Sequence, residues 1–80
     1  MSDMKINVHL FAYLVKYAPE GKKAFSVELK PGSFVRDLIG HLGIPPDVRK
    51  IIIVNGKHGN EDTALDEGDE VTFMTPVEGG

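Results

Sequence analysis

The chain has 80 residues, which predicts one domain with a small hydrophobic core and no room for a large enclosed active site. Apolar residues make up 41% of it and charged residues 26%, a balance that favours a folded protein over a disordered one. The formal net charge is −3 and the lysines and arginines are scattered, so we expect no nucleic-acid partner.

The absence of cysteine excludes disulfides, thiolate metal sites and a cysteine nucleophile. The first residues show no signal-peptide pattern, and no apolar run approaches the roughly 20 residues that cross a membrane. We therefore expect a cytoplasmic protein without a membrane partner.

Strand and helix patterns alternate in the first half of the chain. Every second residue is apolar over residues 5–11, which predicts a half-buried strand. Apolar residues at helical spacing predict a short helix over residues 11–18, ended by Pro19. A second alternation over residues 24–29 predicts a strand that pairs with the first.

The main helix is expected after Pro31 and Gly32. Ser33 offers its hydroxyl as an N-cap, and apolar residues follow at i, i+3, i+4 and i+7. These residues are Val35, Leu38, Ile39 and Leu42. Asp37 lies near the positive end of this helix, and Gly43 stands at the expected C-terminal cap.

Residues 51–54 are four consecutive β-branched residues, typical of a strand that is covered on both faces or central in a sheet. The polar residues 57–62, after a turn at Asn55-Gly56, predict a loop or a weak edge strand. Gly68 predicts a second turn before the last strand, residues 71–74, in which Val71 and Phe73 face one way and Thr72 and Met74 the other.

This order of elements predicts an α+β domain over residues 1–74, with one main helix on a small mixed sheet. Residues 75–80 then form a tail that ends in two glycines and a carboxylate. Glycine backbone can enter a slot that any side chain would block, so the tail is a candidate for delivery into a partner. A frayed chain end is the alternative.

Three stretches together resemble the ubiquitin-like β-grasp sulfur carriers, the MoaD/ThiS family. They are Ile53-Val54-Asn55-Gly56, the segment Leu65-Asp66-Glu67-Gly68-Asp69-Glu70-Val71, and Pro76-Val77 before Gly79-Gly80. Residues 10–14 and the Pro-Val-x-Gly-Gly ending are most similar to the small subunit of molybdopterin synthase. Thr75 and Glu78 depart from that ending, where a proline and a small residue are usual.

The resemblance implies a β-grasp fold and a carrier that is not itself an enzyme. A partner E1-like enzyme would adenylate the Gly80 carboxylate with ATP, and a sulfur donor of the desulfurase or rhodanese type would then replace AMP to leave a thiocarboxylate. The implied acceptor is the large subunit of molybdopterin synthase. No bound cofactor is implied.

Within the tail, which would enter the partner's channel, Gly80 would react, Gly79 would permit entry, and Pro76 and Val77 would position the end. Thr75 and Glu78 belong to the same inserted segment. Proline limits the conformations at the base of the tail, and it also suits the end of a strand. Met74 is either part of a docking patch near the tail or a core methionine under the helix.

Other residues give weaker signals. Six acidic residues lie between Glu61 and Glu70, where they can meet a basic partner or simply face solvent. The three histidines, His9, His41 and His58, have no metal-ligand spacing, so we expect no metal site.

Three functions therefore remain open. The first is a sulfur carrier for molybdopterin, thiamine or tRNA thiolation. The second is a ubiquitin-like modifier that is conjugated through Gly80. The third is a β-grasp interaction module with an inert tail.

Overall fold

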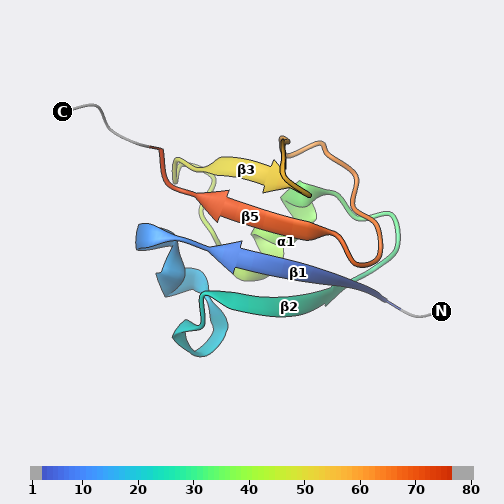
Figure 1. The fold of residues 1–80 in the computed structure, drawn as a ribbon, viewed down its shortest axis with the longest axis horizontal. Helices are drawn as coiled ribbons and strands as arrows, with labels where there is room; N and C mark the ends of the chain where they lie inside the picture. Colours follow the sequence, from blue (N-terminus) through green and yellow to red (C-terminus); the bar gives the residue numbers. More distant parts are fainter. Residues whose placement is uncertain (1–2, 77–80) are drawn as a thin grey trace.

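The structure, a computed structural model, describes residues 3–76 of the chain. This part contains five strands and one α-helix (Figure 1). The strands are β1 (Met4–Leu10), β2 (Ala24–Leu29), β3 (Ile51–Val54), β4 (Lys57–His58) and β5 (Glu70–Met74). The α-helix is α1 (Val35–Leu42), and two 3-10 segments, η1 (Ala12–Tyr17) and η2 (Pro19–Gly21), connect β1 to β2.

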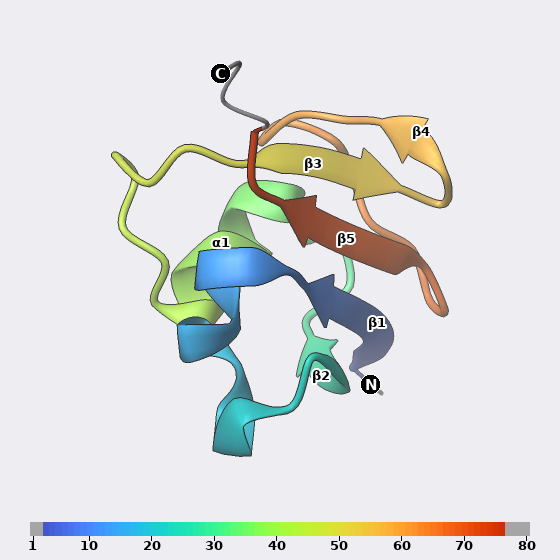
Figure 2. The ribbon, with the colours of Figure 1, turned by 60° about the vertical axis from the view of Figure 1, so that its left-hand side comes forward.

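The strands form one mixed sheet in the order β2-β1-β5-β3-β4 (Figure 2). The two central strands, β1 and β5, run parallel, and the other neighbours are antiparallel. In Figure 1, α1 lies behind the sheet, so the reader looks onto the face that the helix does not cover, which we call the open face. The predicted α+β architecture is confirmed.

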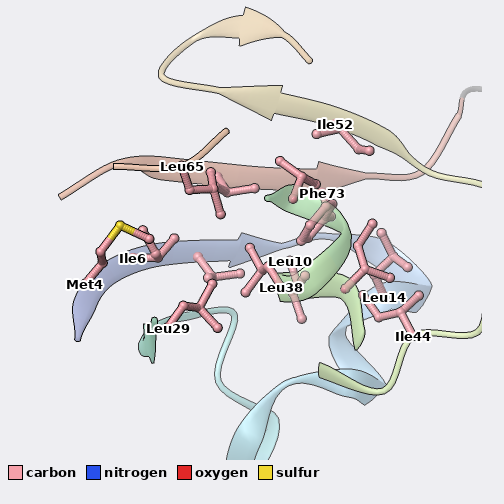
Figure 3. Close-up of a cluster of buried hydrophobic side chains, with 14 residues drawn as sticks. Met4, Ile6, Leu10, Leu14, Leu29, Leu38, Ile44, Ile52, Leu65 and Phe73 are labelled. Carbon is pink, nitrogen blue, oxygen red and sulfur yellow. The ribbon is translucent and has the colours of Figure 1, made fainter. Parts of the chain in front are cut away.

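The register of the sheet brings large side chains from neighbouring strands into one layer under α1. Leu10 lies opposite Phe73, and Phe73 lies opposite Ile52. Together with Leu38 of α1 they belong to the buried core (Figure 3). Burying one such side chain contributes roughly 1.5–3 kcal/mol, so this layer is a main source of stability. The core consists of Met4, Ile6, Val8, Leu10, Leu14, Leu29, Val35, Leu38, Ile39, Ile44, Ile52, Leu65, Val71 and Phe73.

The N-terminus of α1 is capped differently from the prediction. Ser33 is not the N-cap, because its hydroxyl donates to the Lys30 carbonyl at 2.7 Å. Phe34 occupies the capping position, and its backbone N–H donates to the Asp37 carboxylate at 2.7 Å.

Two N–H groups in the first turn of α1, which have no partner within the helix, donate to carbonyls of the loop at residues 61–63. The N–H of Val35 donates to the Thr63 carbonyl at 2.9 Å, and that of Arg36 donates to the Glu61 carbonyl at 3.0 Å. Backbone carbonyls of this loop thus do what a side-chain cap would do.

The helix predicted over residues 11–18 is the 3-10 segment η1. Ala18 is extended, with φ −79° and ψ 142°, as the residue before a proline prefers. Pro19 therefore ends η1 as expected, but it also opens η2. Among the described residues, no helix has the length and apolar character needed to cross a membrane.

The prediction for β3 was wrong in one respect. The strand is next to the edge and only Ile52 is buried, whereas Ile51, Ile53 and Val54 are half-exposed. The central strand is β5, whose alternation of buried Val71 and Phe73 was read correctly.

A matched pair of glycines tests the end of α1. Gly43 has φ 77°, which a Cβ disfavours, so Gly43→Ala should lower the free energy of unfolding by about 1–2 kcal/mol. Gly40 lies within the helix with nothing within 4 Å of an added Cβ, so Gly40→Ala should raise it by about 0.5–1 kcal/mol. Urea denaturation measures both, and equal effects would contradict the left-handed cap.

Candidate docking face and C-terminal tail

The tail begins where the central strand ends. β5 stops at Met74, and Thr75 and Pro76 follow without regular structure and half-buried. Val77, Glu78, Gly79 and Gly80 lie outside the described residues. The predicted start of the tail at Thr75 thus coincides with the end of β5. The C-terminal ends of β1 and β5 lie at the same end of the sheet (Figure 1).

Met74 is not a core methionine under the helix. Successive side chains of a strand point to opposite faces, and Phe73 is fully buried against α1. Met74 therefore points to the open face, where its side chain is 40% exposed. This places it directly beside the root of the tail, as the docking hypothesis requires.

Phe11 lies next to Met74 although the two residues are far apart in sequence. Its backbone N–H donates to the Phe73 carbonyl at 3.2 Å, which extends the parallel ladder of β1 and β5 by one residue. Phe11 has extended backbone and follows the buried Leu10, so its side chain also points to the open face, 43% exposed.

Two isoleucines of β3 complete this apolar surface. Ile51 lies opposite Met74, and Ile53 lies opposite Thr72, so both point to the open face. We call Phe11, Ile51, Ile53 and Met74 the open-face patch. A cluster of exposed apolar side chains is the usual mark of a protein-binding surface.

Sequence reasoning found Met74 but missed its three neighbours. Phe11 was assigned to a helical pattern, and the unbroken run of residues 51–54 hides which side chains face the helix. The missing information was the register: because Ile52 lies opposite Phe73, the antiparallel neighbour presents Ile51 beside Met74.

The other end of the open face is polar. A shallow depression of about 370 Å³ is lined mainly by side chains of β1 and β2. The lining residues are Lys5, Asn7, Val8, His9, Ala24, Phe25, Ser26 and Glu70. The open face is thus divided between an apolar half beside the tail and a polar half away from it.

Several of the six acidic residues make contacts within the chain. Asp62 pairs with Arg36, Glu67 accepts the backbone N–H of Lys5 at 2.9 Å, and Asp69 accepts from the Asn55 amide at 2.9 Å. These contacts join the acidic loops to α1, β1 and the turn after β3, so this stretch has a structural use.

A metal site needs several ligating side chains close together. No group of three or more acidic, histidine or cysteine side chains among residues 3–76 is arranged to hold a metal ion. Thr63, one of the hydroxyl residues, accepts the backbone N–H of Asn60 at 2.9 Å. The tail and the open-face patch therefore remain the functional candidates.

Comparison with known proteins identifies the family. The model of the ThiS family matches residues 8–80, from the middle of β1 to the last glycine. The chain belongs to the ThiS family. No curated protein sequence is significantly similar to it.

Solved structures confirm the β-grasp fold of this ThiS-family protein. A Pyrococcus furiosus protein described as subunit 1 of a molybdopterin converting factor is 30% identical, with a TM-score of 0.77, and the match covers 92% of this chain and 99% of that one. SAMP1 from Haloferax volcanii is 26% identical, with a TM-score of 0.74, over 95% and 99%.

A third structure is a complex of subunits 1 and 2 of the Helicobacter pylori molybdopterin-converting factor. The matched chain of that complex is 22% identical to this chain, with a TM-score of 0.63, and the match covers 96% of this chain and 100% of the matched chain. At this identity the similarity shows the fold.

Neighbouring residues of β5 test the division between core and docking surface. Phe73→Ala should lower the free energy of unfolding by about 3–5 kcal/mol, because it leaves a cavity under α1. Met74→Ala should lower it by less than about 1 kcal/mol, since the side chain is already exposed. Urea denaturation checks both, and a large loss for Met74→Ala would mean that this residue belongs to the core.

Proposed function

We propose that this protein is a sulfur carrier that delivers sulfur as a thiocarboxylate on Gly80 for the synthesis of molybdopterin. The observation that supports this most is the family match, which extends over residues 8–80 and so includes Gly79 and Gly80. The protein would be a co-substrate, and the catalytic groups would belong to its partners. Delivery for thiamine synthesis or tRNA thiolation is the same chemistry with another acceptor.

The proposed chemistry begins with an unreactive group. A C-terminal carboxylate has a pKa of roughly 3.5, so it is ionised at neutral pH and resists nucleophiles. In an E1-like enzyme, a carboxylate oxygen of Gly80 would attack the α-phosphorus of ATP and displace pyrophosphate. The terminal sulfur of the donor's persulfide would then displace AMP to form an acyl disulfide, and a thiol would reduce its S–S bond, so the carbonyl carbon exchanges one oxygen for sulfur.

The geometry at the start of the tail suits this role. Met74 belongs to the open-face patch and directly precedes the tail. The patch can therefore contact a partner while the tail extends from the sheet next to that contact. Six extended residues reach about 20 Å, enough to enter a buried site. Pro76 restricts the start of the tail, which reduces the entropy lost when the tail is inserted.

The names of similar proteins support a particular acceptor. The relative from Pyrococcus furiosus is described as a molybdopterin converting factor subunit, and the Helicobacter pylori structure holds such a subunit with subunit 2. We therefore propose that the large subunit of molybdopterin synthase accepts the sulfur, and that a desulfurase or rhodanese supplies it.

The mass of the intact chain tests the proposal. Incubation with an E1-like enzyme, ATP and a sulfur donor should raise the mass by the difference between one sulfur and one oxygen atom. Deletion of Gly80 should abolish the gain because the reacting carboxylate is displaced from its site. An unchanged mass with enzymes that modify a known carrier in parallel would contradict the proposal.

The same assay tests the docking surface. Met74→Asp places a charge in the open-face patch and should lower the rate of modification at least about tenfold, equivalent to about 1.4 kcal/mol of binding energy. His41→Asp is the control, because His41 is exposed on α1, which lies on the opposite side of the sheet from the open-face patch (Figure 1). Equal rates for the two variants would remove the patch from the mechanism.

A protein modifier is the second candidate, favoured by the similarity to SAMP1, which is also described as a small archaeal modifier protein. In this case the Gly80 carbonyl would form an amide with lysines of other proteins. Expression of an epitope-tagged chain should then yield larger conjugates that disappear when Gly80 is deleted. Thiocarboxylate without conjugates would favour the carrier alone.

A further inference from the structure

One edge of the sheet is unpaired in the described part of the chain. The sheet order ends at β2, and no strand among residues 3–76 pairs with its outer side. The Leu10 N–H donates to the Lys23 carbonyl at 2.8 Å, and the register alternates from that pair. The backbone N–H and C=O groups of Ala24, Ser26 and Glu28 therefore point away from β1 and toward solvent.

The hydrogen bonds on the other side of β1 confirm this alternation. Asn7, which lies opposite Ser26, directs its N–H to the Asp69 carbonyl at 2.9 Å, on the β5 side. The backbone N–H of Asn7 is thus turned away from Ser26. A strand with a free row of donors and acceptors is a template for another strand.

Both faces beside this edge are only partly covered. On the helix side, Phe25 and Val27 are half-exposed, because α1 lies behind β1 and β5 (Figure 1). On the open face, Ser26 borders the polar depression, together with Lys5 and His9. An added strand would place alternate side chains on these two surfaces, one apolar and one polar.

The charge along the edge indicates the occupant. Residues 22–30 contain three lysines and one glutamate, in a chain whose net charge is −3. Lysines stand at both ends of this stretch, Lys22 and Lys30, and Lys22 also lies 3.9 Å from the exposed carboxylate of Glu20. An extended segment with acidic residues complements it, because opposite charges stabilise a paired strand and like charges destabilise it.

A second copy of this chain fits the edge poorly in the register centred on Ser26. Antiparallel pairing of two β2 strands about Ser26 would set Lys22 of each copy opposite Lys30 of the other. Two pairs of like charges would then oppose association. In this register the lysines thus oppose self-pairing, a common use of charge on edge strands.

We propose that the free edge of β2 binds an extended segment of a partner protein in which apolar and acidic residues alternate, and that this segment joins the sheet as a further strand. The site is separate from the open-face patch, since β2 and β3 lie on opposite sides of the central strands. A partner bound there can hold the protein while the tail and the patch engage another partner.

The test uses the full chain labelled with 15N and a capped peptide of about eight residues, the length of an ordinary strand, in which valine alternates with aspartate. Addition of the peptide should shift the amide signals of Ala24, Ser26 and Glu28 and slow their hydrogen exchange. The signals of Ile51 and Met74 should not move. A peptide with lysine in place of aspartate should bind at least about tenfold more weakly.

Two kinds of variant decide the mode of binding. Ser26→Pro removes an N–H that points away from β1, so the ladder with β1 remains and the peptide should bind at least about tenfold more weakly. The double variant Lys22→Glu/Lys30→Glu should weaken binding similarly and reduce its salt dependence. Lys57→Glu, on β4 at the opposite edge, is the control and should bind the peptide normally.

Four results would overturn the proposal: no binding, shifts centred on the open-face patch, equal binding of the lysine peptide, or normal binding by the double variant. Concentration-dependent shifts at β2 without peptide would make a second copy the occupant and would also overturn it. Should Ser26→Pro fail to fold, which its amide spectrum shows, the double variant decides alone.

Discussion

The parallel pairing of β1 with β5 is the constraint on which the rest of the structure depends. It places the first and last strands side by side at the centre of the sheet, with Leu10 opposite Phe73. These two side chains anchor the layer that packs on α1. The same register brings Phe11 beside Met74 on the other face, so one pairing creates both the core and the candidate docking surface.

The two faces of β5 differ in their surroundings: one packs in the core, and the other carries part of the proposed docking surface. Val71 and Phe73 are buried against the helix, and Thr72 and Met74 point to the open face. Substitutions at neighbouring positions therefore have different consequences for folding and for binding. The tail continues from this strand, so its point of departure is fixed by hydrogen bonds from β1 on one side and β3 on the other.

Local patterns in the sequence predicted the elements that local chemistry determines. Alternation gave β1, β2 and β5, and Gly43 marked the end of α1. Contacts between distant residues were not predictable: the loop near Thr63 caps α1 in place of Ser33, and the run of residues 51–54 concealed the exposed side of β3. The tail was found from its glycines, but Phe11 and the isoleucines required the register of the sheet.

The central position of β5 also has a mechanical consequence. A partner that pulls on the tail applies force along the strand, in the plane of the sheet. The ladders to β1 and β3 are then loaded in shear, so their hydrogen bonds resist together and do not open one after another. The fold should therefore withstand a pull on the end of β5 better than it would if β5 were an edge strand.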